Sequence, residues 1–373
     1  MKTQVIRMDA QRVDLSALRR AGELLRGGGL VAFPTETVYG VAACADRPEA
    51  VARLRDVKHR TSEKAFTVHI ALREEAADFV PEFGGMAARL ARKGWPGPLT
   101  MVVPVSKPSE APIMAGRPEA AAAAIYYDGT VGLRCPDDSV AFHVLREAGA
   151  PVIAASANRA GDPPARSGQE AMAALENAVD MLIDTGQTKY AKPSTIVRVE
   201  GERYAVLREG VYDRGIIDRL TQVRFLFVCT GNTCRSPMAA ALARQLLAER
   251  LGFSPAELAD RRIGVDSAGI AGGVGTAAEY AVRAMARRGI DLSSHFSRGL
   301  TGDMVRQADY IFVMTRGQLE AVNRMAPSAS DRVGLLLGDE DLADPLGGSE
   351  EDYERCAASI ERALRARLQE VAL

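Results

Sequence analysis

The sequence is poor in aromatic residues, histidine and cysteine. Aromatic side chains make up 5% of the 373 residues, with one tryptophan, and the chain has four histidines. The cysteines are odd in number and scattered, which argues against the paired disulfide framework of a small secreted domain. They are Cys44, Cys135, Cys229, Cys234 and Cys356. Only Cys229 and Cys234 are close in sequence, and neither the histidines nor the spacing supplies the further ligands of a zinc site.

The sequence also lacks an excess of charge and any long apolar run. Its net charge of -1 argues against a surface that binds polyanions everywhere, although a local basic patch that grips RNA phosphates remains open. No uninterrupted apolar run approaches the ~20 residues of a membrane span. The first twenty residues, "MKTQVIRMDAQRVDLSALRR", contain no apolar core of signal-peptide length. We therefore expect a cytoplasmic protein that does not enter a membrane.

The length and the order of patterns predict two α/β domains. A single hydrophobic core stops growing near ~250–300 residues, and this chain is longer. Buried-strand patterns alternate with helical patterns, which is typical of α/β layers. The strand patterns lie at 30–35, 66–71 and 151–156, the helical patterns at 48–58 and 168–179, and two strands around a turn at 194–212. Residues 213–222 read as a helical connector, so we predict domains at 1–214 and 222–373.

The stretch "VCTGNTCRSP" (228–237) follows a predicted buried strand and precedes a helical pattern. We expect the helix to begin at Ser236 as N-cap, with Pro237 tolerated in the first turn. The preceding loop then lies at a helix N-terminus, where free N–H groups and the helix dipole attract an anion. Gly231 and Asn232 are residue types that tolerate the left-handed backbone of such a loop.

Cys229 and Arg235 are separated by five residues, so a curled loop can turn both toward one tetrahedral anion. A helix N-terminus and a neighbouring cation favour the thiolate, which is the nucleophilic form of cysteine. Arginine can grip two oxygens of the anion at once. In "ADPLGGSEEDY", Asp344 lies in a glycine-rich loop from which it could act as a general acid. Taken singly, these features also fit buried cysteines, a surface arginine and an ordinary Asp-Pro turn.

Together, residues 223–372 resemble the low-molecular-weight protein tyrosine phosphatase family, on "VCTGNTCRSPM", "DSAGI" and "ADPLGG". The resemblance implies a flavodoxin-like parallel sheet with helices on both faces, no metal and no cofactor. It implies that Cys229 forms a phosphocysteine, that Arg235 clamps the transition state, and that Asp344 protonates the leaving group and then activates water. The phosphate loop and its specificity positions would be Thr230, Gly231, Asn232, Thr233, Cys234 and Ser236, with Ser236 donating to the thiolate. In this family the second loop cysteine, here Cys234, can form a reversible disulfide with the nucleophile.

The substrate is expected to be a phosphorylated protein. Tyrosine-specific members tend to carry a bulky aliphatic residue at Thr233 and aromatic residues beside the Asp-Pro, where this chain has Leu346-Gly347-Gly348. "CTGNTCRS" with "DPLGGS" instead resembles the protein arginine phosphatase branch, although that branch usually has phenylalanine at Leu346. A planar, cationic guanidinium rich in N–H donors suits a hydroxyl and a carboxylate better than an aromatic wall. Phosphoarginine is therefore the first expectation and phosphotyrosine the alternative.

The first half carries polar residues after buried strands. In "AFPTETVYG" (32–40), hydroxyls and a carboxylate crowd one turn, and in "VKHRTSEKAFTVHIA" (57–71) three cations precede a strand that carries His69. Such cations are most often solvated, but before a buried strand they could hold a triphosphate. "APVIAASANRAG" delivers Ser156 and Asn158 from a strand into a loop, which suits a ligand at the carboxyl ends of a sheet.

Residues from about 10 to 213 resemble the threonylcarbamoyl-AMP synthase family, whose Lys-x-Arg and Ser-x-Asn pairs appear as Lys58/Arg60 and Ser156/Asn158. The resemblance implies a twisted, open α/β sheet with a concave, basic nucleotide cavity. It implies that L-threonine, bicarbonate and ATP with Mg²⁺ give threonylcarbamoyl-adenylate, for N6-threonylcarbamoyladenosine in tRNA. The expected partners are the proteins that finish that modification and, as an open question, tRNA. The implied site comprises Thr35 and His69 for threonine; Lys58, Arg60, Ser156 and Asn158 for ATP phosphates and the carbamate; Arg134 for a carboxylate or phosphate; and Ser194 and Arg208 for the nucleotide.

The loop at 58–66 departs from this family. Thr61 replaces a usual proline and Lys64-Ala65-Phe66 a common Asn-Pro-Leu, which bears on ATP affinity. The alternative for this half is an RNA-binding module without synthase activity. Threonine-dependent release of pyrophosphate separates the two.

Overall fold

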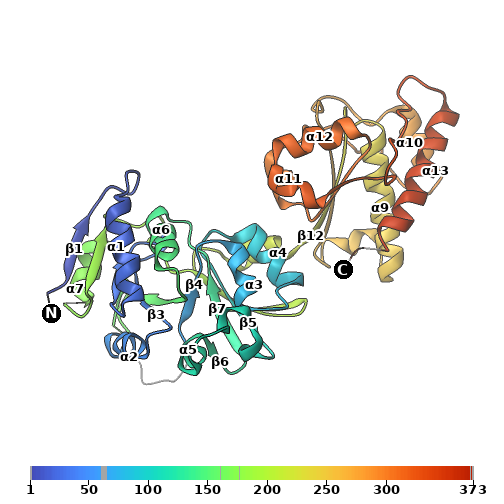
Figure 1. Ribbon diagram of the computed structural model, residues 1–373. Helices are drawn as coiled ribbons and strands as arrows, with labels where there is room; N and C mark the ends of the chain where they lie inside the picture. Colours follow the sequence, from blue (N-terminus) through green and yellow to red (C-terminus); the bar gives the residue numbers. More distant parts are fainter. Residues whose placement is uncertain (1, 60–64, 160, 176, 370, 372–373) are drawn as a thin grey trace. The chain divides into compact units, whose positions relative to one another are not determined.

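The computed structural model describes residues 2–59, 65–159, 161–175, 177–369 and 371. The chain forms two compact units, Met1–Ile217 and Asp218–Leu373 (Figure 1). Residues 213–222, read as a helical connector, contain the helix α8 (Arg214–Thr221).

The first unit is built on one mixed sheet, in which the described residues form eleven strands. The strand order is β1-β9-β2-β3-β8-β4-β7-β5-β10-β11, and β6 pairs with β7. The strands are β1 (Gln4–Arg7), β2 (Val31–Phe33), β3 (Gly40–Cys44), β4 (Thr67–His69), β5 (Leu99–Pro104), β6 (Tyr126–Tyr127), β7 (Thr130–Arg134), β8 (Val152–Ser156), β9 (Met181–Asp184), β10 (Thr195–Glu200) and β11 (Arg203–Arg208). The helices are α1 (Leu15–Arg26), α2 (Pro48–Val57), α3 (Ala76–Phe79), α4 (Gly85–Gly94), α5 (Glu119–Ile125), α6 (Ser139–Ala148) and α7 (Gly168–Leu175).

Helices α1 and α6 pack together against this sheet and share one hydrophobic core with it. Both begin at an aspartate whose carboxylate accepts backbone N–H groups, Asp14 for α1 and Asp138 for α6. The strands predicted at 30–35, 66–71 and 151–156 are present as β2, β4 and β8. The helix predicted at 168–179 ends earlier, at Leu175, and Asn177 beyond it adopts a left-handed φ of 63° that cannot continue a helix.

The strands that carry the predicted ligand residues do not all run in one direction. β4 is parallel to β7 but antiparallel to β8, so His69 lies opposite Val152 rather than Ser156. Ser156 at the carboxyl end of β8 and Asn158 just after it nevertheless line one cavity with His69 and Arg134, which end β4 and β7. The strands contribute Thr67 and His69 of β4 and Ala154, Ala155 and Ser156 of β8 to the lining of this cavity. A ligand at the carboxyl ends of these strands stays a prediction.

The second unit is a parallel sheet with helices on both faces, as expected for a flavodoxin-like fold. Its strand order is β13-β12-β14-β15, and every pair is parallel. The strands are β12 (Val223–Cys229), β13 (Ile263–Gly269), β14 (Tyr310–Val313) and β15 (Val333–Leu335). The helices are α9 (Arg235–Leu251), α10 (Glu279–Ala286), α11 (Gly302–Gln307), α12 (Arg316–Met325) and α13 (Glu350–Arg367). Phe225 and Phe227 of β12 share a core with α9, α10 and α13, whereas Leu226 and Val228 face α11 and α12 (Figure 1).

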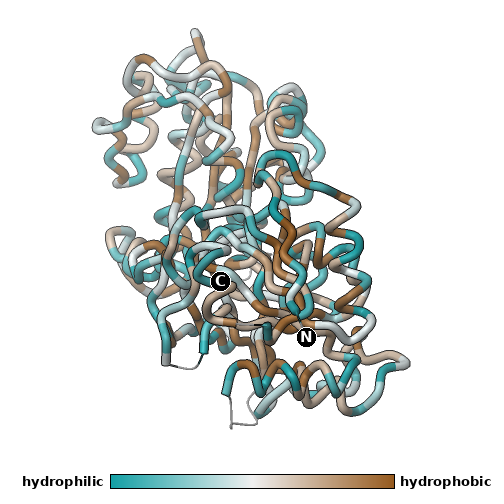
Figure 2. The backbone as a smooth tube through the Cα atoms, turned by 90° about the vertical axis from the view of Figure 1, so that its left-hand side faces the viewer, coloured by the Kyte–Doolittle hydropathy of each residue, from teal (hydrophilic) through white to brown (hydrophobic). Residues whose placement is uncertain are grey.

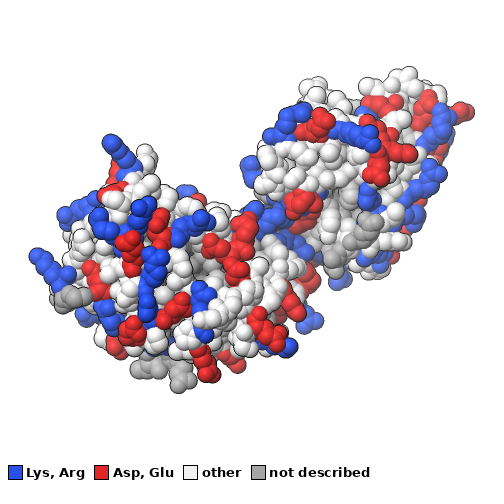
Figure 3. Space-filling view, in the orientation of Figure 1, with Lys and Arg blue, Asp and Glu red and all other residues white. Residues whose placement is uncertain are grey.

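Hydrophobic and hydrophilic segments alternate along the chain in both units (Figure 2). On the face drawn in Figure 3, acidic and basic side chains are interspersed over each unit, in keeping with the net charge of -1. Among the described helices, none combines the length and the apolar composition that a bilayer span requires.

Candidate active sites

The loop Thr230–Cys234 joins the end of β12 to the start of α9, as the sequence predicts. Asn232 has a left-handed φ of 55° and is fully buried. Gly231 does not adopt the left-handed backbone expected of it, and a Cβ there would meet only Thr233 Oγ1, at 3.5 Å. Of these two residues, Asn232 alone therefore takes the left-handed conformation, which asparagine tolerates better than most residues do.

Cys229, the last residue of β12, lies where this loop begins, and 3% of its surface is exposed. Its Sγ lies 2.9 Å from Ser236 Oγ and accepts a hydrogen bond of 3.2 Å from the Asn232 N–H. Ser236 is not the N-cap of α9, because Cys234 occupies that position and Ser236 lies in the first turn. Its hydroxyl is directed to the thiol instead of to the helix backbone. Two donors near sulfur stabilise negative charge on it.

Arg235 and Asp344 form an ion pair beside the loop. The arginine side chain is 5% exposed, and its Nη1 also donates to the Leu342 carbonyl at 3.1 Å. Asp344 belongs to the loop between β15 and α13, and its side chain is 44% exposed. The structure therefore brings the predicted acid to the predicted anion clamp, and an incoming anion would compete with Asp344 for Arg235.

The remaining loop residues have separate partners. Cys234 Sγ lies 3.3 Å from the Tyr353 hydroxyl, and burial and this contact raise the pKa of Tyr353. Thr230 Oγ1 accepts from Gln318 Nε2 at 3.1 Å. Thr233 Oγ1 lies 3.6 Å from Cys234 Sγ. Burial raises the pKa of the Cys356 thiol to about 12, so this cysteine is neutral at ordinary pH.

In the first unit, a cavity of about 470 Å³ gathers most of the predicted ligand residues. Seven of the nine line it: Thr35, His69, Arg134, Ser156, Asn158, Ser194 and Arg208. Lys58 is not a lining residue, but its Nζ donates to Ser156 O at 2.7 Å and to Asn158 Oδ1 at 3.0 Å, and so ties the Ser-x-Asn segment down. Arg60 lies outside the described residues.

Arg134 is the buried cation of this cavity. Its Nη2 donates to Glu36 Oε2 at 3.1 Å, Thr35 Oγ1 at 3.3 Å and Thr37 Oγ1 at 2.5 Å. The Glu36 side chain is 1% exposed, and its Oε1, like Arg134 Nε, has no hydrogen-bond partner within the described residues. Each is a buried polar atom that a ligand or water can satisfy.

A second arginine, the exposed Arg208, also lines the cavity. Arg208 Nη2 donates to Ser194 O at 2.9 Å and to Ser194 Oγ at 3.3 Å, and that hydroxyl lies 2.9 Å from Thr100 Oγ1.

Burial, and then the charge of Arg134, lower the pKa of His69 to about 3. His69 is therefore a neutral imidazole in the folded unit.

Comparison with known proteins matches each unit to a family. Residues 23–210 match the Sua5/YciO/YrdC family, described as telomere recombination, and residues 224–372 match the low molecular weight phosphotyrosine protein phosphatase family. The chain belongs to the Sua5/YciO/YrdC family, with a low molecular weight phosphatase domain behind it.

Individual relatives of the Sua5 domain carry the name threonylcarbamoyl-AMP synthase. The one from Pyrococcus abyssi is 32% identical over 200 residues, which are 54% of this chain and 56% of the relative. The chain spans about half the length of the first curated relatives that it matches. The solved structure of a P. abyssi Sua5 variant is 23% identical, covers 84% of this chain and 100% of that chain, and has a TM-score of 0.51, a likeness of fold. A variant of YwlE from Bacillus subtilis is 32% identical over 40% of this chain and 98% of that chain, with a TM-score of 0.36.

Sequence reasoning missed the residues that support the phosphatase loop from outside it. Asn232 Nδ2 donates to Ser267 Oγ at 2.9 Å, and Asn232 Oδ1 accepts the Arg298 N–H at 3.0 Å. His295 Nε2 lies 2.8 Å from the Asn232 carbonyl oxygen. Ser267 lies within the motif "DSAGI", but no motif around His295 or Arg298 indicates that these residues contact the loop. In the Sua5 domain, Glu36 and Thr100 were not predicted as site residues from the sequence. Thr100 is a site residue because β5 pairs with β7 in a register that places it opposite Arg134, and a local sequence pattern does not show that pairing.

Proposed function

We propose that the chain carries two enzymatic activities, formation of L-threonylcarbamoyl-adenylate in the Sua5 domain and hydrolysis of protein phosphoarginine in the phosphatase domain. The phosphatase proposal rests on the placement of Cys229 Sγ between two donors, next to the Arg235–Asp344 pair. The synthase proposal rests on the cavity in which the buried Arg134, the exposed Arg208, a neutral imidazole and several hydroxyl or amide side chains meet.

The phosphatase reaction proceeds in two displacements. Cys229 Sγ attacks phosphorus, an S–P bond forms, and the P–N bond of phosphoarginine breaks while Asp344 gives its proton to the leaving nitrogen. The Asp344 carboxylate then takes a proton from water, whose oxygen attacks phosphorus and breaks the S–P bond, releasing phosphate and the thiolate. Arg235 holds two phosphoryl oxygens throughout, and Ser236 and the Asn232 N–H stabilise the sulfur when it is charged.

Preference for phosphoarginine is supported by the surroundings of Asp344. Its carboxylate already pairs with a guanidinium, that of Arg235, and it keeps an exposed side. The acid loop offers no aromatic ring, because Leu346, 69% exposed, is followed by two glycines. Thr233 adds a hydroxyl where a bulky aliphatic side chain would favour a phenyl ring.

The test offers phosphoarginine and phosphotyrosine peptides side by side to the whole protein. We expect phosphate release that needs Cys229, is lost in Cys229→Ser and favours phosphoarginine. Thr233→Ile should lower that preference by about tenfold, equal to about 1.4 kcal/mol of transition-state binding, and Thr233→Ser, which keeps the hydroxyl, should retain it. Much faster hydrolysis of phosphotyrosine by the unaltered protein would make the alternative substrate the correct one.

For the synthase, we assign the threonine carboxylate to Arg134, whose Nε is available, and the threonine side to Thr35 and neutral His69. The ATP phosphates and the carbamate are assigned to Ser156, Asn158 and Lys58, with Arg60, and the rest of the nucleotide to Ser194 and Arg208. Threonine and bicarbonate give a carbamate and water; a carbamate oxygen then attacks the α-phosphorus of ATP, and pyrophosphate leaves. Mg²⁺ would enter as the partner of the ATP phosphates rather than at a dedicated protein site.

The corresponding test measures pyrophosphate release from ATP with and without threonine and bicarbonate. We expect release that requires both, and an increase in the KM for threonine of about tenfold or more in Arg134→Lys, because lysine cannot reproduce the forked contacts. RNA affinity without threonine-dependent release would identify the domain as a binding module. We further propose that the adenylate passes to proteins that complete the modification of tRNA.

A further inference from the structure

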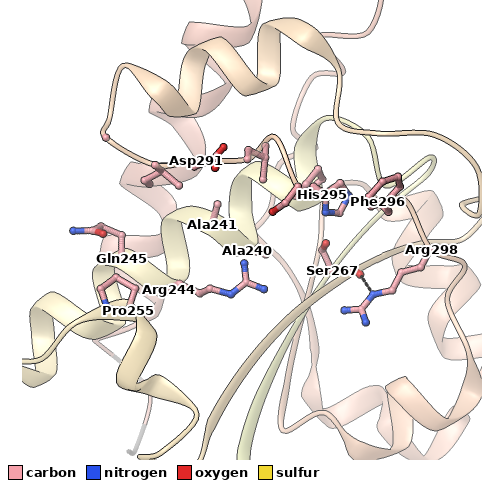
Figure 4. Close-up of a pocket in the computed structure, with 15 residues that line it drawn as sticks. Ala240, Ala241, Arg244, Gln245, Pro255, Ser267, Asp291, His295, Phe296 and Arg298 are labelled. Carbon is pink, nitrogen blue, oxygen red and sulfur yellow. Dashed lines mark hydrogen bonds between the residues drawn. The ribbon is translucent and has the colours of Figure 1, made fainter.

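The phosphatase domain contains a cavity that lies apart from its proposed catalytic residues. It measures about 530 Å³ and lies between α9, the segment Gly289–Arg298 and Ser267 of β13 (Figure 4). None of Cys229, Arg235 and Asp344 lines it. Its volume falls within the ~300–1,000 Å³ typical of sites for small molecules.

Arg244 brings to this cavity a positive charge that has no direct ion pair in the described part of the chain. In Figure 4 its guanidinium extends from α9 into the cavity. Its Nη2 donates to the Val265 carbonyl at 2.6 Å, but no carboxylate of the described residues forms an ion pair with it. Burial and the charge of Arg298 lower the pKa of Arg244, and the charge of Asp266 acts the other way. A cation without an ion pair at the wall of a cavity favours a ligand that brings its own negative charge.

Several other polar groups that line the cavity already have partners within the protein. Arg298 donates to Asp266 Oδ1 at 2.7 Å and to Ser267 O at 2.8 Å. His295 Nε2 contacts the Asn232 carbonyl. Asp291 accepts from the Ser293 N–H at 2.8 Å, and this bond lowers its pKa, so it remains an exposed carboxylate at the rim. Of the two arginines that line the cavity, Arg244 is thus the one without an ion pair to a described carboxylate.

Apart from the polar side chains of Gln245 and Ser294, the rest of the wall is apolar. Carbon surface comes from α9, from the segment Gly289–Arg298 and from the short helix at Pro255–Leu258. The apolar lining residues are Pro237, Ala240, Ala241, Pro255, Ile290, Leu292 and Phe296. The Phe296 side chain is 72% exposed, an unusual position for a large aromatic ring. It offers a face on which a planar group can stack.

We propose that this cavity is a binding site for a small organic anion, whose acid group pairs with Arg244 and whose planar, apolar body stacks on Phe296. The site adjoins the phosphate loop, because Ser267 and His295 line the cavity and both contact Asn232. A bound ligand therefore touches two of the groups that hold the loop. The binding itself does not depend on the proposed phosphatase activity.

The test uses indole-3-acetate as the probe and His295 as the reporter. The chain has four histidines, of which the other three, His59, His69 and His143, lie in the first unit. Histidine labelled with ¹⁵N in the full chain therefore gives few ring signals, and His295→Asn assigns the relevant one by its loss. We expect the His295 signal alone to shift saturably with indole-3-acetate. The neutral isostere indole-3-acetamide should bind at least about tenfold more weakly, as expected for the loss of a charged hydrogen bond.

Three variants locate the probe. Arg244→Gln should weaken binding by about tenfold or more, and Phe296→Ala, at an exposed side chain that the fold does not need, by about threefold. Arg324→Gln is the matched control, an exposed surface arginine outside the cavity, and should bind as the unaltered protein does. Absence of a saturable shift, equal binding of acid and amide, or binding that both Arg244→Gln and Phe296→Ala leave intact would each overturn the proposal.

Discussion

His69 shows how one buried residue can set the acid stability of a domain. Its side chain lies in the wall of the Sua5 cavity, where burial and the nearby Arg134 keep it unprotonated and lower its pKa to about 3. In the unfolded chain the same imidazole has a pKa near ~6.5. Below that pH the unfolded state binds a proton that the folded state does not. The stability of the domain therefore falls as the pH drops from about 6.5 toward 3.

Because the neutral His69 makes the domain less stable at low pH, we expect His69→Asn to weaken the pH dependence of unfolding. Between pH 7.5 and 5, the unaltered protein should lose about 2 kcal/mol more unfolding free energy than the variant, because each pH unit below about 6.5 costs ~1.4 kcal/mol. Asp138 acts with the opposite sign, since burial raises its pKa to about 6, but it is present in both proteins and cancels. Urea unfolding followed by the fluorescence of Trp95, the one tryptophan, reports on this domain. Equal pH dependence in both proteins would contradict the buried, neutral imidazole.

At the scale of the element, the phosphate loop is fixed by the strand beside it. Gly269 ends β13, and a Cβ on it would lie 2.5 Å from Thr230 O and 2.9 Å from the Asn232 nitrogen. These are backbone atoms of the loop and cannot swing aside. The loop can approach β13 this closely because residue 269 has no side chain.

Gly269→Ala should therefore displace the loop and lower kcat/KM of the phosphatase for p-nitrophenyl phosphate by about tenfold to a hundredfold, since small shifts of a reacting group are costly. Gly264→Ala on the same strand is the matched control. Its Cβ would meet Arg224 Cγ, part of a flexible side chain, at 3.3 Å. Threonine-dependent pyrophosphate release by both variants checks that the rest of the chain is intact. Equal phosphatase activity of the two variants would show that the close approach does not matter.

The sequence predicted the features that local patterns specify, and it did not predict contacts between segments that are distant in the chain. Strands, helices and the loop Cys229–Arg235 follow from local apolar period and spacing, and these were predicted. The N-cap at Ser236 was wrong because a tertiary contact, with Cys229 Sγ, takes the hydroxyl that the local rule assigns to the helix. Ser267 and His295 reach Asn232 from distant segments, and no local pattern carries that contact. Likewise, the direction of β8 relative to β4 is a property of the sheet, which adjacent residues do not determine.

At the scale of the whole molecule, each candidate site draws its residues from one unit. The cavity of the Sua5 domain is lined by residues between Thr35 and Arg208, and the phosphatase site by residues between Cys229 and Asp344. Each unit also has its own hydrophobic core of buried side chains. A substitution that removes one reacting group therefore leaves the contacts of the other site unchanged, and substitutions without shared partners act additively.

Two single variants and their combination test this independence. Cys229→Ser should abolish phosphate release and leave the kcat and KM of threonine-dependent pyrophosphate release within about twofold, a change below ~0.5 kcal/mol. Lys58→Ala should lower threonine-dependent pyrophosphate release and leave phosphate release unchanged, because it removes contacts to Ser156 and Asn158 in the first unit alone. Catalytic coupling predicts otherwise: a cross-effect of about fivefold or more in either single variant, or a double variant that departs from the product of the two. In that case the covalent fusion would serve communication between the synthase and the phosphatase, whereas additivity assigns it no role in catalysis at either site.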